Sequence, residues 1–274
     1  MSQMTLYIAR DTLFHRMDGA AKMLLLAAWT VIVFLFQDIR IFIGLFVVGL
    51  LLLSSARLPV RRVRFLIWLM IGFNVFNSLL NMWITPTYGS EIAGSTTVLL
   101  HLGYNVLTLE TVFYVLTLSM KYMSLMPITV LFIFTTHPTR FASSLNRIGV
   151  PYKIAYAFNI AFRYLPELQA EFRHILHALQ ARGVGFGKGE GTISQRLKHV
   201  AWIAIPLVQS SLQRIEQVSN AMDLRGFGKH PLRSWYSATV WRSIDSAVAA
   251  ISLIMLLIAI YIRIQGFGTF WYPF

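Results

Sequence analysis

Hydrophobic residues gather in five stretches of the chain, each long enough to span a lipid bilayer as a helix. These stretches cover residues 20–36, 39–56, 65–84, 111–134 and 244–262. A helix needs about 20 apolar residues to cross a hydrocarbon core of about 30 Å, so the first two stretches are near the lower limit of length. The pattern predicts an all-α integral membrane protein with about five transmembrane helices.

Between the fourth and fifth stretches, the pattern changes from continuous apolar runs to amphipathic helices. In residues 152–181, and again in residues 194–224, apolar side chains recur every three or four positions. This spacing is typical of a helix with one apolar face. Each segment also contains one interior proline, Pro166 or Pro206, which removes a backbone hydrogen bond and bends a helix. We therefore expect two long, bent amphipathic helices outside the bilayer.

Both amphipathic helices are predicted to end in the same way, with an arginine that is followed by glycine. The two ends consist of Ala181, Arg182 and Gly183 in the first helix and of Leu224, Arg225 and Gly226 in the second. Glycine just after the last helical residue is the usual C-cap, because it tolerates a left-handed backbone. An arginine in the last turn also complements the helix dipole, which contributes about 0.3 to 1 kcal/mol. The glycine cap and the helix dipole explain either helix end taken singly. Because the arginine-glycine pair occurs at both ends, a shared role in docking to a partner stays open.

The distribution of basic residues predicts how the chain is oriented. Loop 57–64 contains four arginines, whereas residues 85–110 contain no lysine or arginine. Short cytoplasmic loops carry the excess of basic residues, so the loop and the N-terminus are predicted to be cytoplasmic. The chain then divides into an N-terminal transmembrane region of four spans (1–134), a cytoplasmic coupling-helix domain (135–242), and a final transmembrane helix with an outer tail (243–274).

Composition supports a membrane protein and excludes several kinds of chemistry. Of the 274 residues, 56% are hydrophobic and 13% are charged, with a mean hydropathy of +0.61. The formal net charge of +13 fits cytoplasmic loops that meet anionic lipid, and no nucleic-acid-recognition module accompanies it. The chain has no cysteine, which excludes disulfides, thiolate catalysis and cysteine-based zinc sites.

The glycine-rich segment after the first arginine-glycine pair does not fit a phosphate-binding loop. A Walker A loop has a glycine five residues before the glycine of its Gly-Lys pair, and a Ser or Thr after the lysine. Here Arg182 stands where the first glycine belongs relative to Gly187, and Gly189 follows Lys188. We therefore expect no cofactor in this chain. If ATP drives its function, a partner binds ATP and magnesium and hydrolyses the nucleotide.

Two histidines and the scattered acidic residues are weak candidates for chemistry. His174 and His177 lie three residues apart on one predicted helix and could bind a metal together. They lack a third ligand at a convincing spacing, and histidines on an exposed helix face are the ordinary interpretation. We expect neither a metal site nor catalytic residues.

Polar residues inside the predicted spans form two further candidate sites. Asn74, Asn77, Ser78 and Asn81 form one stripe on the third span. Hydrogen bonding between helices is its ordinary role, and contact with a partner or a solute is the alternative. Lys121 lies near the middle of the fourth span, where a charge costs about 2.5 to 3.5 kcal/mol. It should face protein, with a carbonyl or one of the asparagines as its partner.

Two segments of the chain match the motifs of one known family. The start, LFHRMDGAAK, is similar to His-Arg-Leu-Asp-Pro-Arg-Thr-Lys, with Gly19 in place of proline. Residues 135–183 follow a pattern of Thr-Ser-Pro, Leu-Gly-Val-Pro and Arg-Phe-Ile-Pro into the first Ala-Arg-Gly. The second motif departs from the pattern by Leu224 in place of alanine. In these motifs, and over residues 14–228, the chain resembles the T component of energy-coupling factor (ECF) transporters, the family that includes the cobalt-type transporter subunit Q.

The resemblance implies a non-catalytic subunit of an ATP-binding-cassette (ABC) importer in a bacterial or archaeal cytoplasmic membrane. In this family, the two helix-end arginines dock into grooves on two ABC ATPase subunits, a homo- or heterodimer, and each arginine meets an acidic residue there. The T subunit also holds a small membrane-embedded substrate-binding S subunit, which recognises the vitamin or transition metal. The residues expected to have structural roles or to contact the S subunit are Asn74, Asn77, Asn81, Lys121, Pro138, Pro151, Pro166 and Pro206.

A self-contained secondary transporter or channel is the competing class. Such proteins are expected to have internal repeats of their spans, broken helices at matching positions and buried acids for ion coupling. Five spans with a basic insertion of about a hundred residues have none of these features.

Overall fold

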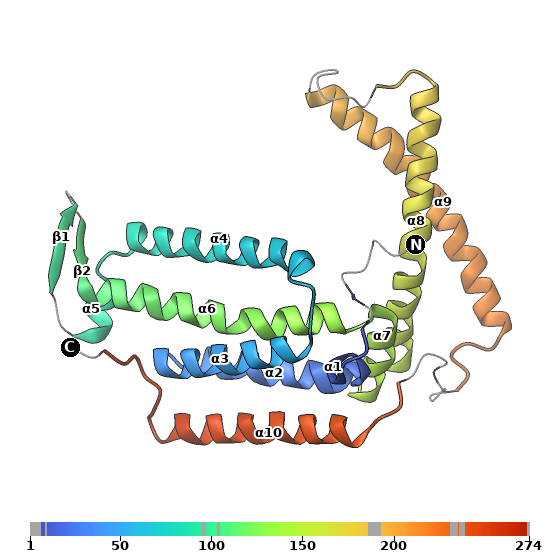
Figure 1. Cartoon of the computed structure of the whole chain (residues 1–274). Helices are drawn as coiled ribbons and strands as arrows, with labels where there is room; N and C mark the ends of the chain where they lie inside the picture. Colours follow the sequence, from blue (N-terminus) through green and yellow to red (C-terminus); the bar gives the residue numbers. More distant parts are fainter. Residues whose placement is uncertain are drawn as a thin grey trace. The chain divides into compact units, whose positions relative to one another are not determined.

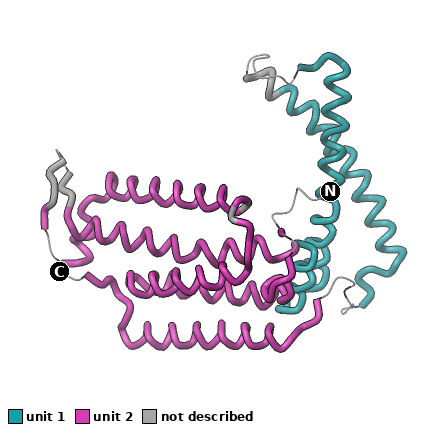
Figure 2. Tube along the Cα trace, in the orientation of Figure 1, with its two compact units in different colours: residues 1–5, 138–238 teal, residues 6–137, 239–274 magenta. Residues whose placement is uncertain are grey.

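The computed structural model describes residues 7–8, 10–94, 97–102, 105–185, 193–230, 235 and 239–272, and its helices are shown in Figure 1. The chain divides into two compact units (Figure 2). Unit 1 contains Met1–Thr5 and Pro138–Ala238, and unit 2 contains Leu6–His137 and Thr239–Phe274. The predicted all-α class is confirmed, with one small β-hairpin that the sequence did not predict.

Unit 2 is built from apolar helices and holds the predicted spans. Its helices are α1 (Leu13–Arg16), α2 (Gly19–Leu35), α3 (Ile39–Ser55), α4 (Val60–Ile84), α5 (Tyr88–Ala93), α6 (Leu109–Thr135) and α10 (Ser243–Ile264). By length and composition, Val63–Ile84 of α4 and the whole of α6 and α10 can cross a membrane. The helices α2 and α3 are also apolar but have only 17 residues each, as their sequence patterns predicted.

The two short helices, α2 and α3, each begin after an aspartate whose side chain caps the helix. The Asp18 side chain accepts a hydrogen bond from the backbone N–H of Ala20 at 2.8 Å, and Asp38 accepts one from that of Arg40 at 2.9 Å. Such caps satisfy backbone donors that have no partner within the helix. The short connection between α2 and α3 is therefore a turn in which the second aspartate begins the next helix.

The helices of unit 2 form a bundle with α2, α3 and α6 inside it and α4 and α10 at its edges (Figure 1). Helix α4 packs mainly on α6, and α10 packs mainly on α2. The core contains Trp29 and Phe42, which are at most 1% exposed. The Trp29 Nε1–H donates to the Ser124 carbonyl at 3.1 Å. A side chain at Gly49 would come within 3.0 Å of Pro127, so glycine lets α3 and α6 approach closely.

One end of unit 2 carries the hairpin and the C-terminal tail. The strands β1 (Val98–Leu102) and β2 (Asn105–Thr108) pair antiparallel, and α5 packs against α6. Phe270, Trp271 and Tyr272 pack edge-on against Phe113 at the start of α6. The Arg40 guanidinium lies 3.5 Å from the centre of the Trp271 ring. The tail is therefore bound to the bundle through aromatic and cation–π contacts.

Unit 1 consists of α7 (Pro138–Arg147), α8 (Tyr152–Ala181) and α9 (Ile193–Leu224), with α8 packed on both other helices. The two long helices cross each other in Figure 1. Both continue without a break through their interior prolines, Pro166 and Pro206. Pro138 is the first residue of α7 and Pro151 is the N-cap residue of α8, positions at which a missing N–H has little cost.

Candidate functional site

The end of α8 is a glycine cap that leaves Arg182 at the C-cap position. Gly183 has a φ of 84°, in the left-handed region that glycine adopts without strain. Its N–H donates to the Gln180 carbonyl at 3.0 Å, and the Val184 N–H donates to the Leu179 carbonyl at 3.1 Å. This pair of hydrogen bonds is a Schellman motif. The predicted glycine cap is confirmed.

The end of α9 repeats this cap position by position. Gly226 has a φ of 67°, and its N–H donates to the Asp223 carbonyl at 2.9 Å. The Phe227 N–H donates to the Met222 carbonyl at 3.0 Å. Arg225 therefore occupies the same C-cap position as its counterpart in α8, and both ends share one backbone conformation.

The two arginine ends lie on the surface of unit 1. Arg182 and Arg225 are exposed, and the neighbouring Leu224 is 90% exposed although it is apolar. A guanidinium group presents five N–H donors in a rigid fork that matches a carboxylate. Each end can therefore offer a carboxylate-binding group next to a small or apolar contact surface.

An aromatic cluster packs beside the C-terminal end of α9. The sequence patterns did not predict this cluster. The Phe227 ring, two residues after Arg225, lies 4.9 Å from that of Tyr156 and 5.9 Å from that of Tyr152. The Trp235 ring lies 5.1 Å from Tyr152, and its Nε1–H donates to Asn146 Oδ1 at 3.2 Å. This aromatic cluster connects the end of α9 to the start of α8 and to α7. Two tyrosines four residues apart were its only local signal in the sequence.

A pocket of about 470 Å³ lies between α8 and α9, close to the second end. Most of its lining is apolar, and it includes Ile160 and Leu168 of α8 together with Ile215 and Met222 of α9. Arg214 and Glu167 form an ion pair between the two helices. The two helices therefore enclose an apolar pocket and are joined by an ion pair across it.

The polar stripe of the third span is divided between two kinds of contact. The Asn74 amide donates to the Ser119 carbonyl of α6 at 3.0 Å, and the Ser78 and Ser119 hydroxyl groups are 2.8 Å apart. These bonds confirm the expected hydrogen bonding between helices. Asn81 instead donates to the side chain and the carbonyl of Asn77, one turn earlier on α4. This pair is only partly buried, as Ser78 is, whereas Asn74 is buried.

Lys121 is partly buried and lies near aromatic rings of two other helices. The amine nitrogen lies 5.2 Å from the centre of the Phe34 ring and 6.0 Å from that of Phe42. The amide of Asn74, one of the expected partners, donates to the Ser119 carbonyl. Aromatic faces attract a cation through their quadrupole, and they come from α2 and α3, which the span's own sequence cannot reveal.

The described part of the chain contains no group of three or more His, Asp or Glu that could hold a metal ion. His174 and His177 lie on the exposed surface of α8. Gly187, Lys188 and Gly189, at which a Walker A loop was rejected, lie outside the described residues.

Comparison with known proteins assigns the family. The family model described as CbiQ, cobalt transport protein, matches residues 10–235. The chain belongs to the CbiQ family. Three relatives named energy-coupling factor transporter transmembrane protein EcfT align with almost their whole length. The one from Lactococcus lactis subsp. cremoris (strain MG1363) is 28% identical over 265 residues, which cover 93% of this chain and 95% of that protein.

The other two relatives give the same result. The protein from Bacillus subtilis (strain 168) is 24% identical over 271 residues, covering 94% of this chain and 96% of the relative. The protein from Brevibacillus brevis is 28% identical over 265 residues, covering 92% and 94%. The predicted resemblance is confirmed, and this CbiQ-family chain is a membrane transporter component rather than an enzyme.

Proposed function

We propose that this CbiQ-family chain is the energy-coupling transmembrane subunit of an ECF-type ABC importer. The names of its EcfT relatives and the apolar helices of unit 2 support this proposal. The subunit links ATP hydrolysis by two ABC ATPase subunits to the uptake of a vitamin or a transition metal. A membrane-embedded S subunit captures the solute. The chain lies in the cytoplasmic membrane with its N-terminus and unit 1 in the cytoplasm.

The observation that carries the proposal is the repeated cap, which presents an exposed arginine at each of two helix ends. A single capped end is ordinary, but two ends with the same bonds and the same residue at the C-cap suit two equivalent partners. Each guanidinium group is proposed to meet a carboxylate in a groove of one ATPase. ATP and magnesium then bind to the ATPases and not to this chain.

The exposed surface of the long helices also supports a role in assembly. Ile205, Leu212 and Ile215 on α9 are at least 60% exposed. Apolar surface of this kind on a helix outside the bilayer is typical of a protein–protein contact. In unit 2, the partly buried Asn77 and Asn81 are proposed to contact the S subunit.

Charge reversal at each end tests the docking role. Arg182→Glu or Arg225→Glu should leave the protein in the membrane but sharply reduce co-purification of the ATPases and abolish uptake. Removing one partner of a buried charge pair costs about 2 to 5 kcal/mol, and reversal adds repulsion. Arg173→Glu is the matched control, because Arg173 is also exposed on α8 but lies away from its end.

Two results would contradict the proposal. One is normal recovery of the ATPases and normal uptake with either reversed arginine. The other is uptake by the purified chain alone in proteoliposomes, which would favour a self-contained transporter.

A further inference from the structure

The start of α2 buries several ionisable side chains that the docking ends do not use. His15, Asp18 and Lys22, all from the segment HRMDGAAK, are 8%, 1% and 3% exposed. Burying a charged group is costly unless it is paired and hydrogen-bonded. The partners of these side chains therefore indicate what the segment holds in place.

Lys22 holds the end of α6. Its amine nitrogen donates to the carbonyl of Thr135, the last residue of α6, at 2.8 Å. A cation at this position also complements the negative end of the α6 dipole. The last turn of α6 is thereby fixed to the first turn of α2.

Asp18 holds the segment that leads into α10. One carboxylate oxygen caps α2, and the other accepts a hydrogen bond from the Thr239 hydroxyl. The Asp18 N–H donates to Asp245 Oδ1 at 2.8 Å, and Asp245 Oδ2 accepts the Arg242 N–H at 2.8 Å. Asp245 is fully buried at the start of α10. These bonds fix Thr239 and the first turn of α10 to the first turn of α2.

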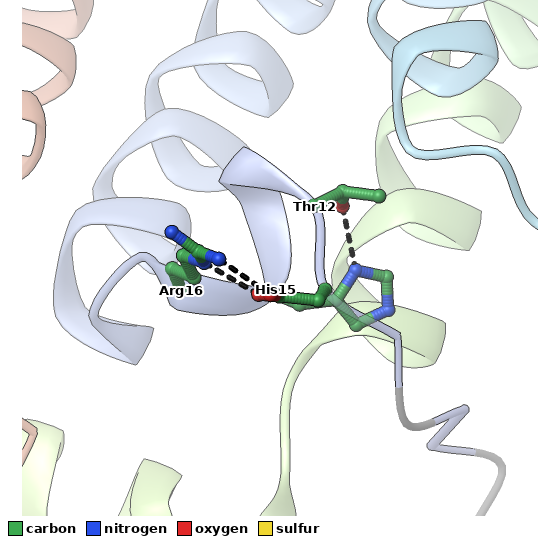
Figure 3. A network of polar contacts seen from close by, with 4 residues as sticks. Thr12, His15 and Arg16 are labelled. Atoms are coloured by element: carbon green, nitrogen blue, oxygen red, sulfur yellow. Dashed lines mark hydrogen bonds and ion pairs between the residues drawn. The ribbon is translucent and has the colours of Figure 1, made fainter.

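The segment before α2 has local bonds of its own and reaches His137 through one ring contact. Thr12 and His15 are joined by a hydrogen bond of 2.7 Å, and Arg16 is paired with Asp11 (Figure 3). The Tyr7 ring lies edge-on to the rings of both His15 and His137, with centroids 6.1 and 5.0 Å away. His137 is the last residue of unit 2 before the chain enters unit 1.

Two connections between the units are thus attached to one helix start. The chain enters unit 1 at Pro138, three residues after Thr135, and returns to unit 2 at Thr239. We propose that the first turn of α2, through Asp18 and Lys22, is a joint that transmits movement of unit 1 to α2, α6 and α10. This inference rests on the proposed function, since it assumes that ATPases move unit 1.

A displacement is passed on only where a connection is stiff. A connection of two or three residues without side-chain bonds would absorb a displacement by changing its own backbone angles. Buried hydrogen bonds to charged groups are strong, and breaking one leaves an unpaired charge in the interior. The bonds at Thr135 and Thr239 therefore favour movement of whole helices over movement of the two connections.

The test measures coupling in the complete complex. The chain is co-expressed with its ATPases and S subunit, the complex is placed in proteoliposomes, and ATP hydrolysis and solute uptake are measured together. Lys22→Met and Asp18→Asn should keep the ATPases bound and hydrolysing. The uptake per ATP hydrolysed should fall by about 2- to 30-fold, the range that single residues in a coupling network typically control. Lys22→Arg keeps the cation and should restore most of the uptake.

Controls separate a loss of coupling from a loss of folding. Ser252→Ala removes another buried hydroxyl, which is bonded within α10 to Val248, and should leave the uptake per ATP unchanged. Thr239→Val removes the hydroxyl group that donates to Asp18, and it decides the question if Lys22→Met or Asp18→Asn fails to assemble.

The inference is overturned if assembled Lys22→Met and Asp18→Asn complexes transport as much solute per ATP as the wild type. If those two variants do not assemble, an unchanged ratio in Thr239→Val overturns it. Failure of all three to assemble also overturns it, because the cluster would then serve folding alone. Failure of the proposed function looks different, since the wild-type chain would then not bind ATPases at all.

Discussion

The two units differ in how much of their helices they bury. Unit 2 has large side chains in its core, such as Trp29, Phe42 and Phe134, at no more than 2% exposure. In α8, by contrast, only Ala155 is buried, and within residues 198–224 of α9 only Ile203 is buried. Helices of 30 and 32 residues gain most of their stability from packing an apolar face. The proposed contacts with other subunits would bury the apolar surface that unit 1 leaves exposed.

A second contrast lies within unit 1, between two ends with the same cap. Phe227 follows Arg225 and packs into the aromatic cluster, whereas Val184 holds the equivalent position after Arg182. The two ends share a backbone conformation, but among the described residues only Phe227 of these two packs into the aromatic cluster. The end of α9 therefore contacts the start of α8.

The largest expected effect tests the contrast in burial. Trp29→Ala removes a buried ring and its hydrogen bond to Ser124, and should destabilise the protein by about 3 to 5 kcal/mol. Leu212→Ala, at a site that is 60% exposed, should change stability by no more than about 0.5 kcal/mol but reduce recovery of partner subunits. Thermal unfolding in detergent and co-purification measure the two effects. Equal destabilisation by both variants would show that unit 1 is packed as tightly as unit 2.

A smaller effect tests the contrast between the two ends. Phe227→Ala loses two ring contacts, each worth about 0.5 to 1.5 kcal/mol, and should weaken ATPase binding at Arg225 several-fold. Binding is measured with Arg182→Glu in the background, so that only this end can dock. Val184→Ala, measured with Arg225→Glu in the background, is the matched control and should bind normally. Equal losses in the two variants would mean that the aromatic cluster has no special role.

The smallest effect concerns the pH dependence of unit 2. Burial lowers the pKa of His15, and the charge of Lys22 lowers it further. As the pH falls below about 6.5, the unfolded chain therefore binds a proton at this residue before the folded chain does. The free energy of unfolding should decrease over that range and level off below the folded-state pKa.

His15→Gln should remove this part of the pH dependence, and unfolding temperatures at pH 7.5 and 5.5 measure it. His174→Gln, on the exposed surface of α8, is the control and should behave as the wild type does. If His15→Gln kept the full wild-type pH dependence, other groups would be responsible.

Features that depend on neighbouring residues were predictable from the sequence. The apolar runs gave the helices of unit 2 to within a few residues, and the glycines after Arg182 and Arg225 gave both caps. Hydrophobic periodicity and left-handed glycine are local properties, so one sequence contains them. The docking role of the two arginines stays a prediction.

Features that depend on distant residues were not predictable. Lys121 lies against Phe34 and Phe42, which come from two other helices, and the tail folds back on Phe113. Lys22 binds a carbonyl 113 residues away. The hairpin was missed because its short strands lie in a segment whose glycines, threonines and lack of basic residues indicated a loop.

The repeated cap has a consequence for the stoichiometry of the proposed importer. The hydrogen bonds that cap the helix at Arg182 repeat those at Arg225, so the two ends share one backbone conformation. If both ends dock as proposed, one kind of ATPase subunit is sufficient to bind both. A preference for one of two different ATPases would then depend on the surroundings of each end, such as the rings beside Phe227.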